Sequence, residues 1–216
     1  MRAIRTVLLA AAFAPRLAAT AAPASAQIAD ADWILKALAR PAPMRTDFVE
    51  VRVSPLLKDP LRLVGEYRRP VSDTLVREVR APYAETTTLR AGEATIARAG
   101  KTPRRFSLSR APELASLQSS FGALLAGDRP QIERVYTLKA QGPRERWTLT
   151  LAPKDKALAA RVRDITLYGQ GAELRCIETR PVKGDLQRTL LASAALAVKP
   201  ATDARAMEGL CRSGVK

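Results

Sequence analysis

The sequence contains no histidine among its 216 residues. It therefore lacks the commonest general base of enzymes and the commonest nitrogen ligand of metal ions. Its two cysteines are far apart and have no C-x-x-C spacing, which argues against a zinc site and against an activated thiol nucleophile. From these absences we expect no metal ion, no cofactor and no enzymatic activity.

Other catalytic patterns are also missing. Gly169-Gln-Gly171 lacks the third glycine and the following helix of a dinucleotide-binding loop, so it is better explained as a hairpin turn. The nearest approach to a Ser-Lys pair, Ser54 to Lys58, is one residue too long and contains Pro55. Hydrolysis of an acyl ester is the enzymatic alternative, and we expect none.

No apolar run reaches the ~20 residues that a membrane-spanning helix needs. The amino terminus instead has Arg2 and Arg5, then the apolar stretch TVLLAAAFA, then the A-x-A sequence Ala24-Ser25-Ala26. This order is typical of a secretory signal peptide. We expect residues 1–26 to be cleaved off after Ala26, leaving residues 27–216 as one exported, periplasmic domain. An uncleaved anchor is the alternative.

Acidic residues are few, since 36 Lys and Arg stand against 21 Asp and Glu, a formal charge of +15. A nucleic-acid partner is disfavoured because the basic residues are scattered along the chain and because an exported protein rarely meets nucleic acid. An anionic membrane surface is the favoured partner, with a merely soluble cationic surface as the alternative.

The two cysteines, Cys176 and Cys211, are an even count in a chain expected to be exported, which favours a disulfide. Closing such a loop would stabilise the fold by roughly 3.5 to 4 kcal/mol on the chain-entropy model. The bond would fix the carboxyl-terminal segment ATDARAMEGLCRS, where we expect a short helix, to the body of the domain.

Short alternating runs dominate the rest of the chain. An amphipathic helix is predicted over residues 30–39, capped by Asp30 or Asp32, and a leucine-rich helix over residues 112–127. The remaining runs have the period of strands: DFVEVRV, LRLVGEYR, TLVREVRAP, ETTTLR, EATIAR and RRFSLS, then IERVYTLKA, ERWTLTL, RVRDITLYG, AELRCIET and LQRTLLA. Their short turns predict a mainly β (α+β) fold, a strongly curved antiparallel half-barrel of about eleven strands whose concave face is covered by helices.

Alternate strand positions form one apolar set. It consists of Leu61, Leu63, Tyr67, Leu75, Val79, Phe106, Leu108, Trp147, Leu149, Leu151, Ile165 and Leu167. Such a set is ordinarily plain core. Here about eleven strands curve over few and short helices, so a groove that accepts a ligand becomes plausible.

The order of these segments resembles the LolA-like periplasmic lipoprotein carriers, in particular a divergent LolA-related branch. The resemblance lies in DFVEVR, LRLVGEYRRP, LVREVRAP, RAGEATIAR, LLAGD, RWTLTLAPKD and ARVRDITLYGQGAELRCIE, and covers roughly residues 30 to 191. It implies a half-open barrel that shields acyl chains, a lid formed by Leu114, Leu117, Phe121, Leu124 and Leu125, and a latch at Arg69 that binds backbone carbonyls of the covering helices. Arg68 is the alternative latch.

The resemblance also implies partners. The cargo would be a lipoprotein or another acyl or polyene lipid, received from an inner-membrane donor and passed to an outer-membrane acceptor by a monomeric carrier. The alternative is a structural or accessory subunit of an envelope lipid or polyene pathway, with a barrel filled by its own side chains.

Overall fold

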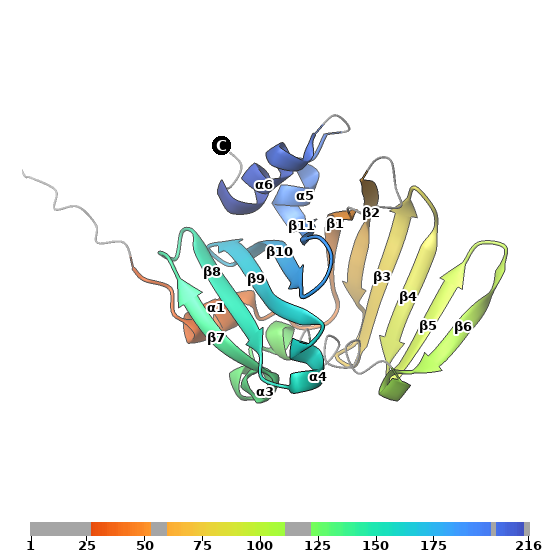
Figure 1. Cartoon of the computed structure of the whole chain (residues 1–216), viewed down its shortest axis with the longest axis horizontal. Helices are drawn as coiled ribbons and strands as arrows, with labels where there is room; N and C mark the ends of the chain where they lie inside the picture. The colour runs from red at the N-terminus through yellow and green to blue at the C-terminus, as the bar shows by residue number, and fades with distance from the viewer. Residues whose placement is uncertain (1–26, 53–59, 111–121, 200–201, 214–216) are drawn as a thin grey trace, which may run out of the picture.

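The computed structural model describes residues 27–52, 60–110, 122–199 and 202–213. Eleven antiparallel strands form one open, curved sheet in the order β6-β5-β4-β3-β2-β1-β11-β10-β9-β8-β7 (Figure 1). The strands are β1 (Met44–Arg52), β2 (Leu61–Arg69), β3 (Thr74–Ala81), β4 (Glu85–Arg90), β5 (Glu93–Arg98), β6 (Lys101–Ser107), β7 (Tyr136–Gln141), β8 (Trp147–Pro153), β9 (Val162–Gln170), β10 (Glu173–Pro181) and β11 (Gln187–Leu191). The predicted fold class is confirmed.

The strands that come first and last in the sequence, β1 and β11, are neighbours in the middle of the sheet. β1 pairs with β11 from Phe48 opposite Leu191 to Val51 opposite Arg188. The sheet therefore consists of two meanders, β1 to β6 and β7 to β11, joined along this seam. Its two edges, β6 and β7, are strands from the middle of the chain.

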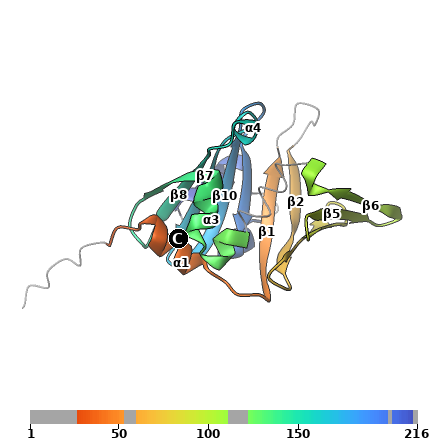
Figure 2. The same ribbon diagram turned by 90° about the horizontal axis from the view of Figure 1, so that it is seen from below.

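The predicted first helix is confirmed as α1 (Ala31–Leu38). Asp30, not Asp32, caps it, because a carboxylate oxygen of Asp30 accepts the backbone N–H of Trp33 at 2.8 Å. Ile34 and Leu35 are fully buried and belong to the same core cluster as Leu149 of β8. The side of the sheet against which α1 packs is called the concave face below; Figure 2 shows α1 in front of β7, β8 and β10.

One predicted strand begins later than its alternation suggested. Of IERVYTLKA, the first four residues belong to helix α3 (Arg129–Val135), and only the rest forms β7. Asp128 caps α3 by accepting the backbone N–H of Gln131, and Pro130 occupies its first turn. These two residues stop the strand pattern from extending backwards. The expected PKDK turn likewise contains a short helix, α4 (Lys156–Ala159).

Not all helices cover the concave face, which corrects the sequence-based expectation. α5 (Ala192–Leu196) and the predicted tail helix α6 (Ala204–Ser213) lie on the opposite, convex face (Figure 1). They form a core cluster there with Val49, Cys176 and Leu190, whose side chains alternate with those of the concave face. The reason is the disulfide between Cys176 and Cys211, which is confirmed and joins α6 to the convex side of β10.

The predicted leucine-rich helix falls largely outside the described residues, which include its α-helical residues 122–126. No helix within the described ranges is long and apolar enough to cross a membrane.

Candidate functional site

The predicted apolar set lies on one face of the sheet. Directly paired residues of neighbouring strands share a face, and the register pairs Trp147 with Gly169, Leu149 with Leu167 and Leu151 with Ile165. Crossing the seam, Leu191 pairs with Phe48, Phe48 with Gly65 and Gly65 with Val79. Leu75 lies on the same face of β3 as Val79. It pairs with Leu89, Leu89 pairs with Ala94, and Ala94 pairs with Phe106. All of the predicted residues that lie in strands therefore point to the concave side. Leu108 was expected on a strand but lies in the 3-10 helix that follows β6, because β6 ends at Ser107.

The two halves of the concave face are covered differently. Over β7 to β10, α1 and residues 122–126 pack onto Trp147, Leu149 and Leu151 and bury them. Over β3 to β6, the single-turn 3-10 helix Leu108–Arg110 places Leu108 against Leu89 and Ala94, while Leu75 and Phe106 stay only partly buried. Leu61 and Tyr67 are partly buried around Leu63 and Val79, between the two halves.

A pocket of about 490 Å3 lies where the covering helices meet the sheet. Leu38 comes from α1, Leu124 and Leu125 from the helix of residues 122–126, and Leu174 and Leu191 from the sheet. The volume falls within the ~300–1,000 Å3 of typical ligand pockets. Of the five predicted lid residues, Leu124 and Leu125 thus contact this space, and Leu114, Leu117 and Phe121 lie outside the described residues.

A buried ion pair interrupts the apolar concave face. Nη2 of Arg77 donates to Oε2 of Glu50 at 2.8 Å, and the guanidinium of Arg77 also lies over the ring of Phe48, 4.7 Å from its centre. Arg52 is the second partner of Glu50. Burial raises the pKa of Tyr67 beside this pair, although the charge of Arg77 opposes the shift. The concave face therefore contains one buried ion pair, Arg77 with Glu50, among its apolar side chains.

Arg69 and Arg68, which the sequence left as alternatives for the latch, point to opposite faces. Arg68 forms ion pairs with Glu66 and Glu78 on the convex face. Arg69 is 8% exposed and donates from Nη1 to the backbone carbonyl of Arg40 at 3.2 Å, just beyond α1. Its Nη2 donates to the carbonyl of Ser72 at 3.0 Å, in the turn between β2 and β3.

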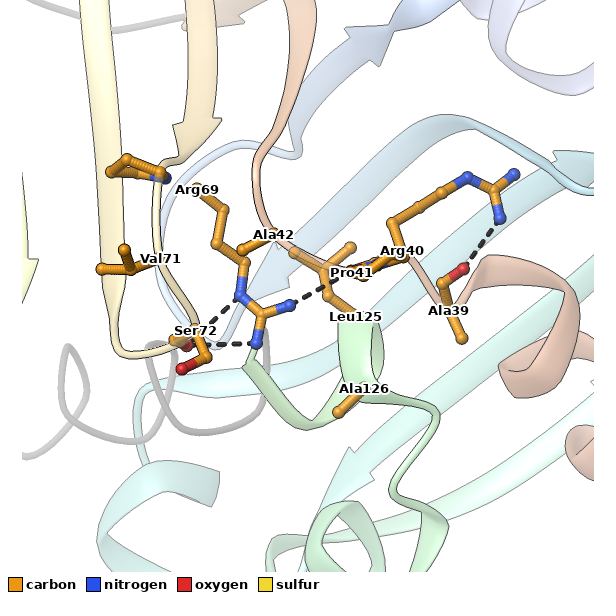
Figure 3. A pocket seen from close by; sticks show the side chains of 10 residues that line it. Ala39, Arg40, Pro41, Ala42, Arg69, Val71, Ser72, Leu125 and Ala126 are labelled. Atoms are coloured by element: carbon orange, nitrogen blue, oxygen red, sulfur yellow. Dashed lines mark hydrogen bonds between the residues drawn. The ribbon is translucent and has the colours of Figure 1, made fainter.

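Arg69 also connects indirectly to the helix of residues 122–126. The backbone N–H of Arg40 donates to the carbonyl of Leu125 at 2.9 Å, so one peptide segment joins α1, that helix and the guanidinium of Arg69. Figure 3 shows this guanidinium between Ser72 and the chain at Arg40, with Leu125 beside it. The surrounding pocket has a volume of about 660 Å3 and is lined by Ala39, Arg40, Pro41, Ala42, Arg69, Pro70, Val71, Ser72, Leu125 and Ala126.

Sequence reasoning missed some residues of the concave face. Phe48 is fully buried at its centre, yet it was left out of the predicted set because Glu50, two positions later, interrupts the apolar alternation; Val49 and Val51 belong to the convex side. Leu191 was missed because it is the last residue of its strand, immediately before α5. The proximity of Phe48 to Tyr67, whose ring centres are 4.8 Å apart, could not be derived without the register.

Two solved structures have a distant similarity to this chain. A LolA superfamily protein from Nitrosomonas europaea is 12% identical with a TM-score of 0.38, covering 75% of this chain and 90% of that chain. LprF from Mycobacterium bovis is 15% identical with a TM-score of 0.33, covering 78% and 94%. No curated protein matches the sequence.

The decisive comparison is with a family model described as "Outer membrane lipoprotein carrier protein LolA-like", which matches residues 21–214. That match spans the whole sheet and all the helices of the described chain. The protein therefore belongs to the LolA-like family of outer-membrane lipoprotein carriers.

Proposed function

We propose that this protein is a non-enzymatic periplasmic carrier that holds the acyl chains of a lipoprotein or lipid against its concave face and transfers them towards the outer membrane. The observation that carries the proposal is the single apolar face, together with the pocket of about 490 Å3 between that face and its covering helices. Family membership supports a carrier of this kind. The signal-peptide pattern of residues 1–26 supports export.

The energetics suit transient binding. Burying a CH2 group contributes about 0.8 kcal/mol, so a chain of about sixteen carbons would gain on the order of 10 kcal/mol before costs. Moving α1 and the helix of residues 122–126 away from the sheet costs free energy, and so does the loss of translational and rotational freedom of the cargo. Both offset part of this gain. The net affinity can then be high enough to shield the chain and low enough to release it to an acceptor.

The hydrogen bonds of Arg69 support a latch that holds the cover closed. They connect the end of β2 to the segment just after α1, and through Arg40 to Leu125. Breaking them would let α1 and the helix of residues 122–126 move away from the half of the sheet that they cover.

The test is lipid uptake by matched variants. Native mass spectrometry without detergent should find co-purified lipid, and the protein should bind a fluorescent fatty acid. Leu75→Glu, which places a charge on the less covered half of the concave face, should abolish that uptake. Val64→Glu is the control, because Val64 is 38% exposed and faces the convex side of the neighbouring strand β2.

One outcome would contradict a carrier, and another would remove the concave face as the place where uptake is measured. A single apo mass without fatty-acid uptake would favour the accessory subunit with a filled interior. Equal loss of uptake in both variants would show that a charge anywhere on the sheet is disruptive, so that uptake would not report on the concave face.

A further inference from the structure

Arg175 is a buried arginine with one edge of its guanidinium unused. It lies at the bulge of β10, between Leu174 and Cys176, and is 4% exposed. Nη1 donates to the side-chain oxygen of Gln170 at 2.8 Å. Nε and Nη2 have no hydrogen-bond partner within the described part of the chain.

The geometry of the two unpartnered nitrogens determines which ligands they can bind. Nε and Nη2 form one side of the planar guanidinium, and their N–H bonds run parallel, so they match two oxygens of one carboxylate or phosphoryl group. Arginine does not lose its proton in proteins, so burial cannot be relieved by neutralisation. A buried donor without an acceptor is unfavourable, and this edge of Arg175 has two.

A pocket of about 290 Å3 adjoins this side chain. It lies on the convex side of β8, β9 and β10, and its lining includes Arg175, Thr148, Tyr168, Cys211 and Arg212. Arg146, from the turn between β7 and β8, is exposed at its rim. Trp147 and Gly169, whose positions face the concave side, also belong to the lining, so the pocket lies at the ends of these strands and mainly on their convex side.

Charges around the pocket favour an anion. Arg212 is already engaged with Glu178 and Glu208, at 3.4 and 2.7 Å, and adds little net charge. Arg146 has no ion pair among the described residues, and the one acidic lining residue, Glu145, is exposed. The pocket also meets the carboxyl-terminal end of α6, whose dipole disfavours anions, so the attraction must come from Arg175 and Arg146.

We propose that this pocket binds a phosphoryl group, and that the Arg175 side chain shifts towards it so that two of its oxygens accept from Nε and Nη2, which are buried in this structure. A phosphoryl group suits the site better than a carboxylate because its further oxygens can accept from Arg146 and from the hydroxyl of Thr148. The ligand is either a soluble phosphate or the head group of an anionic phospholipid. The site lies on the face opposite the acyl-chain groove, so it stands whether or not the proposed function is correct.

The test is calorimetric titration with inorganic phosphate and with vesicles of phosphatidylcholine, with or without phosphatidic acid. The full folded protein should bind phosphate, phosphatidic acid vesicles or both, and Arg175→Met should weaken that binding at least roughly tenfold. Arg163→Met is the matched control. It removes the same charge from an exposed residue at the other end of β9. Binding of phosphate alone assigns a soluble ligand, and binding of vesicles alone assigns a head group.

Thermal unfolding supplies a second readout. Without phosphate, Arg175→Met should melt at a higher temperature than the wild type, because it removes a buried, unsatisfied charge. The phosphate-induced rise in melting temperature should disappear in the same variant. A merely structural arginine would show the reverse, a lower melting temperature and an unchanged phosphate effect.

Three results would overturn the proposal. They are absence of binding to both probes, wild-type binding by Arg175→Met, and acetate binding as strongly as phosphate. If Arg175→Met does not fold, Arg146→Met takes its place, since Arg146 is exposed, and it should weaken binding relative to Arg163→Met.

Discussion

The guanidinium of Arg77 lies between the carboxylate of Glu50, 2.8 Å from Nη2, and the ring of Phe48, 4.7 Å from its centre. The carboxylate is buried, with the side chain of Glu50 only 6% exposed, so its charge depends on its partners. Attraction to Tyr67 and Glu50 raises the pKa of Arg77, although burial opposes that shift. A hydrogen-bonded pair of Arg77 and Glu50 therefore lies within a mainly apolar surface.

Arg77→Met should destabilise the protein by about 3 kcal/mol, because it leaves the carboxylate of Glu50 buried with Arg52 as its remaining partner. Urea unfolding measures the change. The double variant Glu50→Leu with Arg77→Met should recover most of the lost stability, since a buried pair can be replaced by apolar side chains. A double variant less stable than Arg77→Met would contradict this account.

Arg69→Leu should speed the exchange of bound fatty acid, because it removes the hydrogen bonds to the carbonyls of Arg40 and Ser72. Stopped-flow release of a fluorescent fatty acid measures the rate. Arg68→Leu is the matched control, since it makes the same change on the convex face. Equal release rates in the two variants would remove the latch from the proposed mechanism.

Gly169→Ala should destabilise the protein by about 1 to 3 kcal/mol, the usual range for overpacking. A Cβ at this position would lie 2.0 Å from Cζ2 of the buried indole of Trp147. The change should also alter tryptophan fluorescence as Trp147 shifts. Gly122→Ala is the control, because its added Cβ meets nothing within 4 Å and should leave stability unchanged or slightly higher.

Glu178 gives a prediction about pH. Burial raises its pKa, but hydrogen bonds from Arg188 and Tyr168 and the charges of Arg188 and Arg212 outweigh burial, so the pKa stands below its ordinary value. A carboxylate with a lowered pKa stabilises the fold above its unfolded pKa, about 4.3, and loses that contribution as the pH falls through the native pKa.

Glu178→Gln should therefore lower stability at pH 7, and its deficit relative to the wild type should shrink as the pH falls below about 4. Urea unfolding between neutral and acidic pH measures this difference. Glu93→Gln is the control, because Glu93 is exposed and has no ion pair within the described ranges. A deficit that stays constant with pH would show that the charge of Glu178 is not responsible.

Replacing both cysteines with alanine should lower stability by about 4 kcal/mol, the chain-entropy value for a loop of this length. Cys176 and Cys211 are 35 residues apart, and both are buried where α6 meets β10. In limited proteolysis of this variant, α6 should then be cleaved earlier than the strands of the sheet. Full protection of α6 in the alanine variant would mean that packing alone holds this helix.

The sheet could be predicted because alternation, turn residues and strand length agree in nearly every segment. In the run around Trp147, apolar side chains recur at every second residue, and this run became a strand with Trp147, Leu149 and Leu151 on one face. Prediction was wrong before Tyr136, where Asp128 and Pro130 begin a helix within residues that also alternate. Local capping chemistry outweighed the two-residue period there.

Features that depend on several strands could not be predicted. The pairing of Glu50 with Arg77 crosses from β1 to β3 past the intervening β2, so it depends on the registers of two strand pairs. The position of α6 on the convex face depends on which side of β10 Cys176 points to. The orientation of Arg175 depends on a bulge, which adds one residue to a strand and redirects the side chains around it.

The pairing of β1 with β11 also affects when the protein can fold during its synthesis. β1 is among the first parts of the domain to be synthesised, yet its partner on one side is a strand made nearly at the end of the chain. Contacts so distant in sequence form slowly. An emerging polypeptide consequently cannot complete its central strand pair until almost all of the chain has been synthesised.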